Sequence, residues 1–133
     1  MAQVMKGKEF IVEIPDEVGA GARALEALVK DRINLACFVG YGTGGGKAYI
    51  HLVPEDSDRA LTALRGAGYQ VQVSDAVLYV SEDRPGLAAD VLRKLANAGI
   101  NLVHCYATAV GATNALLVIR TSDDERAVGV LSG

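Results

Sequence analysis

The chain has few of the residues that mark several common protein classes. Its only two cysteines, Cys37 and Cys105, lie far apart and form no CxxC motif, so we expect reduced thiols in a cytoplasmic protein. The net charge is −3 and no basic cluster occurs, so nucleic acid is not a predicted partner. No apolar run approaches the about 18 residues of a membrane span, and the first residues lack the apolar stretch of a signal peptide.

Hydrophobic residues, by contrast, are plentiful. They make up 50% of the 133 residues, which is enough for a packed core and argues against disorder. The length suits one compact domain or two small ones.

An internal repeat runs through the chain. A shift of 67 residues aligns 9–66 with 76–133 without a gap, and fifteen of these 58 pairs are identical. The tripeptide Ile33-Asn34-Leu35, for example, recurs as Ile100-Asn101-Leu102. An ungapped register through loops and helices indicates a duplication rather than a chance similarity of two Ala-rich segments.

Each copy shows the same order of predicted elements. A β-rich run (10–14 or 77–80) precedes a helix, two strands begin at Ile33 or Ile100 and at Ala48 or Ala115, and a short helix follows an Asp-rich cap cluster. The apolar spacing predicts one buried stripe on each first helix, at Ala22, Leu25, Leu28, Val29 and at Ala88, Val91, Leu92, Leu95. Pro85 is expected in the first helical turn.

The fold class follows from this order. Each copy is predicted to be an α+β, ferredoxin-like βαββαβ unit, with an antiparallel sheet of order 4-1-3-2 and two helices on one face. The expected units are 8–74 and 75–133. The first copy ends in a strand at 69–73, but the second stops at Gly133, the counterpart of Gly66, and therefore lacks its last strand.

Two arrangements could fill the vacant position. Residues 69–81 could continue as one long strand, with the vacancy taken by a second chain or by residues 1–6. Alternatively, Ser74-Asp75 turns a hairpin and strand 69–73 serves both copies, giving seven strands. We favour the shared strand, because it explains why the second copy can end at Gly133, although a chain cut short is a simpler explanation.

Motifs of catalysis are weak. The stretch Gly40–Gly45 matches GxGxxG, but a strand follows where a dinucleotide site needs a helix; a flexible hairpin is the interpretation, with a loop over an anion as the alternative. His51 and His104 lack nearby metal-ligating residues and are interpreted as packing residues. We predict no catalytic residues, no metal and no cofactor.

One polar turn recurs between the first strand and the first helix. It reads Asp16-Glu17-Val18-Gly19 and Asp83-Arg84-Pro85-Gly86, and an Asn follows each Asp by eighteen residues. A carboxylate suits an ammonium group, a helix N-terminus suits a carboxylate, and an Asn amide both donates and accepts. These groups match a free amino acid. The alternative is that each Asp only caps its helix and each Asn only forms a turn.

The string Asp83-Arg84-Pro85-Gly86-Leu87 followed by Gly99-Ile100-Asn101-Leu102 resembles the signature of the ACT family. That family consists of regulatory modules that bind small molecules in amino-acid metabolism, and the resemblance to stand-alone tandem members covers nearly the whole chain. In a serine-binding member, the strand–helix loop of one copy and the second-strand Asn of a neighbour hold the effector. The resemblance implies ligand-binding positions at Ser81, Asp83, Arg84, Pro85, Gly86 and Asn101, and at Asp16, Gly19 and Asn34.

Ile14 stands where the second copy has Ser81, and Val18 replaces the proline, so the first copy departs from the signature. The implied function is an amino-acid-binding regulatory protein without enzymatic activity. A structural or regulatory subunit of a separate amino-acid-metabolism enzyme, with no ligand of its own, is the alternative. The second strands are expected at sheet edges, where pairing between copies would give a homodimer or a higher closed oligomer.

Overall fold

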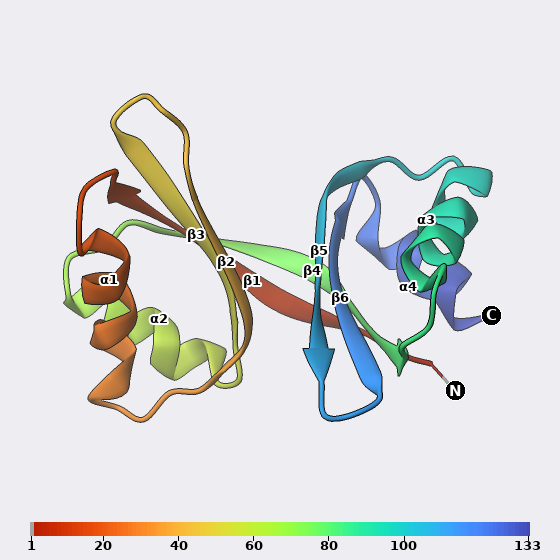
Figure 1. Ribbon diagram of the computed structural model, residues 1–133, viewed down its shortest axis with the longest axis horizontal. Coiled ribbons are helices and arrows are strands. Elements are labelled where there is room, and N and C mark those ends of the chain that lie inside the picture. Colours follow the sequence, from red (N-terminus) through yellow and green to blue (C-terminus); the bar gives the residue numbers. More distant parts are fainter. Residues whose placement is uncertain (1) are drawn as a thin grey trace. The chain divides into compact units, whose positions relative to one another are not determined.

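A computed structural model describes residues 2–133 (Figure 1). The chain divides into two compact units: residues 8–74, here called the first unit, and residues 75–133 together with the residues up to Gly7, here called the second unit. In chain order the elements are β1 (Gln3–Pro15), α1 (Ala20–Val29), β2 (Leu35–Gly42), β3 (Lys47–Pro54), α2 (Ser57–Gly66), β4 (Val71–Glu82), α3 (Leu87–Asn97), β5 (Leu102–Val110), β6 (Asn114–Thr121) and α4 (Asp124–Ser132).

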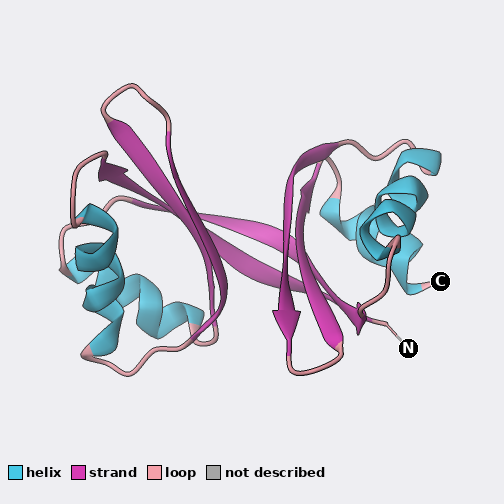
Figure 2. Ribbon diagram, in the orientation of Figure 1, coloured by secondary structure: helices cyan, strands magenta, loops and turns pink. Residues whose placement is uncertain are grey.

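The first unit is a four-stranded sheet with helices α1 and α2, and both helices cover the same face of the sheet (Figure 2). Its strand order is β2-β3-β1-β4, the predicted 4-1-3-2 arrangement. Strand β1 pairs antiparallel with β3 through Phe10 and Leu52, and β2 pairs antiparallel with β3. Alternate β1 residues Phe10, Val12 and Ile14 point to the helices and are buried, as the period-2 pattern of a half-covered strand requires.

The second unit repeats this architecture, but β1 and β4 exchange their places in the strand order. Its order is β1-β4-β6-β5, so β4 takes the place that β1 has in the first unit. Val77, Tyr79, Leu117 and Ile119 form the sheet side of its core, and α3 covers them with Leu87, Val91 and Leu95. The fold class predicted from the sequence is therefore confirmed.

Strand β4 settles how the two copies are connected. It runs without interruption from Val71 to Glu82, and neither Ser74 nor Asp75 has a positive φ. The hairpin at Ser74-Asp75, and with it the shared strand and the seven-stranded order, is wrong. A two-residue hairpin needs backbone conformations that Ser and Asp do not favour, so the chain continues as an extended strand.

The N-terminal residues supply the strand that the second copy lacks. Residues 3–7 of β1 belong to the second unit, beside β4, and Ala2 and Val4 pack against its core. Lys6 Nζ lies 3.9 Å from the Asp75 carboxylate in the same unit. Of the two arrangements considered, the long strand with the vacancy filled by the first residues is therefore the observed one.

The short helices are capped as predicted. The Asp56 side chain accepts from the backbone N–H of Arg59 at 3.2 Å, and that of Asp123 accepts from Arg126 at 3.1 Å. The same two arginines hold the ends of the preceding helical segments, since Arg59 donates to the carbonyl of Asp31 and Arg126 donates to its counterpart Ala98 at 3.0 Å. These paired contacts explain why both arginines belong to the repeat.

Two details of the first helices differ from expectation. Helix α1 buries Ala20, Ala24 and Leu28, whereas Ala22 and Val29 of the predicted stripe are exposed and Leu25 is half-buried. In an Ala-rich helix several stripes are almost equally apolar, so periodicity does not define which one faces the sheet.

In α3 the same reasoning applies: Val91 and Leu95 are buried as expected, but Ala88 is exposed and Leu92 is half-buried. Pro85 precedes the helix, because the N-cap is Gly86 and α3 begins at Leu87. No helix among residues 2–133 is long and apolar enough to cross a membrane.

Candidate functional site

The recurring polar loop is anchored in the same way in both units. The backbone N–H of Asp16 donates to Gly46 O at 3.1 Å, and that of Asp83 donates to the counterpart Thr113 O at 2.8 Å. Each loop is thereby fixed to the hairpin turn that joins the second and third strands of its unit. The Gly-rich segment is this hairpin, as predicted, and not the start of a helix.

The two loop aspartates do not cap their helices. The N-cap residues are Gly19 (φ 84°) and Gly86 (φ 86°), and neither helix has a side-chain cap. A positive φ is costly for other residues, which explains the glycine at this point in both copies. The interpretation of Asp16 and Asp83 as simple caps is therefore wrong, and both carboxylates are exposed to solvent.

The asparagines lie at the other end of each sheet. The carbonyl of Asn34 accepts from the backbone N–H of Glu55, and the carbonyl of Asn101 accepts from that of Ser122. In the first unit, the eight residues of β3 separate this end from the turn that holds Asp16, a length of about 27 Å. Within one unit the Asp and the Asn therefore cannot contact the same ligand, and a single-copy site built from both is wrong.

In the second unit, the remaining predicted positions lie in the loop between β4 and α3 or next to it. Ser81 is half-buried on β4 opposite Ala115 of β6, while Arg84, Pro85 and Gly86 are exposed. Arg84 is held by a 2.6 Å ion pair with Asp90. The first unit has the corresponding pair with its charges exchanged, Glu17 with Arg23 at 2.9 Å.

A cleft of about 350 Å³ opens beside the loop of the first unit. Asp16 and Glu17 stand at its rim. Leu25 and Gly21 of α1 form one wall, and the rest of the lining comes from three strands: Ile14 and Pro15 of β1, Phe38, Gly40, Tyr41 and Gly42 of β2, and Ala48, Tyr49 and Ile50 of β3.

Small residues keep this cleft open. A Cβ on Gly42 would lie 2.8 Å from a carboxylate oxygen of Asp16, so only glycine allows the Asp16 side chain to rest against β2. Glu17 is engaged by Arg23, whereas the Asp16 carboxylate has no hydrogen-bond or ion-pair partner within residues 2–133. Asp16 is thus the carboxylate that an incoming cationic group can use.

Sequence reasoning missed the β2 side of this cleft. Phe38, Gly40 and Gly42 alternate along the strand, so all three point to the helix-covered face. The sequence signal for this side was one aromatic residue followed by glycines at i+2 and i+4. On one face of a strand, this spacing leaves a space without side chains next to the aromatic ring. Phe38 is 52% exposed at the strand edge.

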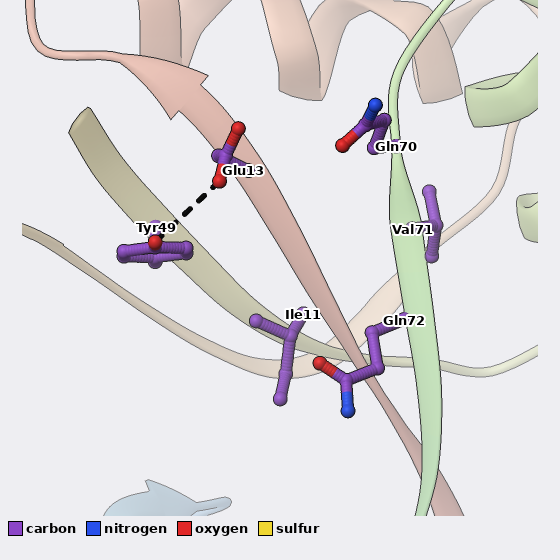
Figure 3. Close-up of a pocket in the computed structure, with 6 residues that line it drawn as sticks. All are labelled: Ile11, Glu13, Tyr49, Gln70, Val71 and Gln72. Carbon is purple, nitrogen blue, oxygen red and sulfur yellow. Dashed lines mark hydrogen bonds between the residues drawn. The ribbon is translucent and has the colours of Figure 1, made fainter.

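A second hollow lies on the face of the first unit that the helices leave uncovered (Figure 3). It has a volume of about 530 Å³ and is lined by Ile11, Glu13, Tyr49, Gln70, Val71 and Gln72. The Glu13 carboxylate accepts from the Tyr49 hydroxyl at 3.5 Å and lies 3.5 Å from Lys47 Nζ. The Glu13 carboxylate therefore already has two partners, whereas the Asp16 carboxylate has none among residues 2–133.

The same uncovered face carries a buried polar chain. Tyr41 Oη lies 2.8 Å from His51 Nε2, and His51 Nδ1 lies 3.6 Å from an oxygen of the fully buried Glu9. The expectation that His51 has no metal-ligating residue nearby is therefore wrong, because the fold places the Glu9 carboxylate beside it.

Both cysteines are free thiols. Burial, with the added charge of Glu9, raises the pKa of the Cys37 thiol, and burial raises the pKa of Cys105. Neither thiol is activated as a nucleophile would be.

The chain thus consists of two ferredoxin-like units, each with a glycine-capped helix after an Asp-containing loop. The family model described as "ACT domain pair" matches residues 5–132. The chain belongs to this family, as the loop signature predicted.

Several solved structures are similar to the chain. A protein from Bacteroides thetaiotaomicron is 26% identical, with a TM-score of 0.88 over 97% of this chain and 88% of that one. The ligand-free regulatory subunit of aspartate kinase from Thermus thermophilus is 17% identical, with a TM-score of 0.71 over 98% and 94%. Its counterpart from Thermus flavus is 18% identical, with a TM-score of 0.66 over 99% and 94%. No curated protein matches the chain.

Proposed function

We propose that the protein is a regulatory module that binds a free amino acid with an apolar side chain. The single observation that carries this proposal is the cleft beside Asp16. One uncommitted carboxylate stands at the rim of a hollow whose walls are Leu25, Phe38 and Ile50. Such a hollow combines an apolar interior with one polar group that fixes orientation, as small-molecule sites do.

The two ends of an amino acid find partners at this cleft. Its ammonium group pairs with Asp16. The carboxylate faces Gly21 in the first turn of α1, where helix N–H groups lack intrahelical acceptors and the dipole is positive. The side chain occupies the space above Gly40 and Gly42. In this orientation the ligand's ammonium group meets the negative charge of Asp16 and its carboxylate meets the positive end of the α1 dipole, and both groups belong to the same loop region.

The loop of the second unit is proposed as a further ligand site. Asp83 is exposed there, and Asn101 lies at the far end of its own sheet. A ligand that contacts both kinds of residue therefore needs the loop of one unit and the Asn of another. We propose that a second copy of the chain supplies such a partner.

The edge strands support association between copies. Strands β2 and β5 end the strand order, as predicted for the second strands. Phe38 on β2 and Val103 on β5 are more than half exposed, and an unprotected edge with apolar side chains favours pairing with another sheet.

A thermal-shift screen of the twenty amino acids tests the proposal. Binding to the folded state stabilises it by ~2.7 kcal/mol at a hundredfold excess over Kd, so an apolar amino acid should raise the melting temperature. The matched control is Asp16→Asn compared with Asp58→Asn, an exposed aspartate on α2 away from the cleft. The shift should be lost only in the first variant.

The second candidate function is a regulatory subunit of a separate amino-acid-metabolism enzyme. It is favoured by the similar solved structures, because two of them are regulatory subunits of aspartate kinase. A screen in which no amino acid stabilises the protein, together with co-purification of an enzyme, would support this candidate over the ligand-binding module.

A further inference from the structure

We propose that the second unit carries an anion site on helix α3, distinct from the amino-acid cleft of the first unit and next to the loop that contains Asp83, for a small molecule with a phosphate or carboxylate group. A hollow of about 280 Å³ lies between Tyr79 of β4 and one side of α3. Three cations line it, Arg84, Arg93 and Lys94, with Asp90 as the only carboxylate. The proposal goes beyond the proposed function and does not depend on it.

Tyr79 gives the hollow a fixed hydrogen-bond donor. Its side chain is 7% exposed and belongs to the core of the second unit. Its hydroxyl makes no hydrogen bond with another described residue and is not fully enclosed by protein, and the residue lines the hollow. The buried ring therefore fixes the position of a hydroxyl that can donate to a ligand in the hollow.

The cations are arranged around this donor. Arg84 is oriented by its 2.6 Å ion pair with Asp90. Arg93 and Lys94 make no ion pair or side-chain hydrogen bond with any described residue. The buried side chains of Leu87 and Val91 form the floor of the hollow. An oxyanion here would accept from a hydroxyl and from charged donors, which form the strongest hydrogen bonds in proteins.

The first unit shows that the fold itself does not require these groups. At the positions shifted by 67 residues, Val12 replaces Tyr79, Glu17 replaces Arg84, Arg23 replaces Asp90, and Glu26 and Ala27 replace Arg93 and Lys94. The loop-to-helix ion pair is kept with its polarity reversed. Two carboxylates and one cation thus occupy the same scaffold where the second unit has three cations and one carboxylate.

This comparison separates a site from a solvated helix face. The structural feature, the ion pair, is common to both copies. The hydroxyl and the excess positive charge are present at these positions in the second unit but not at the corresponding positions of the first, and together they select an oxyanion. The volume suits a compact ligand near the lower limit of small-molecule pockets.

The test uses the intact chain and NMR titrations at low ionic strength with inorganic phosphate, with succinate and with sodium chloride. We expect saturable amide shifts at Tyr79, Arg93 and Lys94, and none at Val12, Glu26 and Ala27. Saturation by phosphate alone or by succinate alone would each support the site and identify the class of its ligand. Equal shifts with sodium chloride would overturn it, because simple screening affects all salts alike.

The decisive variant is the double substitution Arg93→Glu with Lys94→Ala, which installs the residues of the first unit. Both side chains are exposed, so the fold should persist, and affinity should fall at least tenfold. Tyr79→Phe keeps the buried ring and should weaken binding about tenfold, the equivalent of one hydrogen bond to a charged group. Unchanged affinity in the double variant would refute the proposal, whatever the result for Tyr79→Phe.

Discussion

Val4 and Val71 lie 67 residues apart and fill equivalent places in two different cores. Val71 packs against the core of the first unit and Val4 against that of the second. The residues before them are also equivalent, since Gln3 matches Gln70. The repeat therefore extends to the first residues of the chain, and the strand that the second copy lacks at its end is present at the beginning.

Val4→Ala should destabilise the second unit by about 1 kcal/mol, because a half-buried valine loses part of its packing. Hydrogen exchange read separately for amides of β6 and of β3 will show the effect as faster exchange in β6. Met5→Ala, at a 46% exposed position on the same strand, is the matched control. Equal effects of the two substitutions would contradict the assignment of Val4 to the core.

Asp83→Ala and Asn101→Ala should each weaken binding of a confirmed amino acid at the second loop, with little loss of stability, because both residues are exposed. The loss of a hydrogen bond to a charged group costs ~1.5–3 kcal/mol. Calorimetry with both variants and with Asp16→Asn will show which loop binds. If all three variants retain the original affinity, the ligand binds elsewhere.

Phe38→Glu should prevent the proposed dimer from forming, because it places a charge on the exposed edge of β2 without entering the core. Sedimentation velocity at micromolar concentration measures the change. Val29→Glu is the control, since Val29 is 69% exposed on α1 and lies outside the edge strands. A wild-type chain that sediments only as a 13.9 kDa species at high micromolar concentration would argue against the dimer.

Stability should decline above the ordinary pKa of a thiol. Burial raises the pKa of Cys37 and Cys105, so the folded state keeps protons that the unfolded state releases. Below the unfolded pKa this preference is fully present, and it is lost as pH rises through the folded pKa, by at most about 1.4 kcal/mol per pH unit for each group. Urea unfolding between pH 8 and 10 should show this slope, and the Cys37→Ala, Cys105→Ala variant should flatten it.

Arg32→Gly should stabilise the first unit by about 0.5–1 kcal/mol. Arg32 is the only non-glycine residue with a positive φ (53°) within residues 2–133, and its counterpart in the repeat is Gly99 (φ 73°). A left-handed conformation costs a side-chain-bearing residue more than glycine, in part offset by the entropy of unfolded glycine. Gly99→Arg should have the opposite sign. A lower midpoint of urea unfolding for Arg32→Gly would show that its side chain contributes more than the backbone costs.

Much of the fold was predictable because the repeat constrains it. Gly19 and Gly86 are identical in the repeat, and each is the N-cap of its helix. Arg59 and Arg126 are also identical, and the side chain of each donates to a backbone carbonyl at the end of the preceding helical segment. The 4-1-3-2 order followed from the βαββαβ order of the elements in each copy. The path through Ser74-Asp75 was not predictable in this way, because local turn preference and the need to fill an edge position pointed to different answers.

The candidate site was only partly predictable. The loop signature identified Asp16 and Asp83, but sequence spacing could not show that Asn34 lies at the opposite end of its sheet, since distance across a sheet depends on strand length and pairing. Gly42 escaped notice for a similar reason. Its contact with Asp16 joins residues 26 positions apart, and no local pattern encodes such a contact.

The division of β1 between two units imposes an order on biosynthesis. Residues 3–7 leave the ribosome before the strands of the sheet they complete, which are β4, β5 and β6 and end at Thr121. At a translation rate of about 5–20 residues per second, this strand segment remains without its partners for on the order of ten seconds. The first unit can close around the later half of β1 during that time, while residues 3–7 wait for the strands of the second unit.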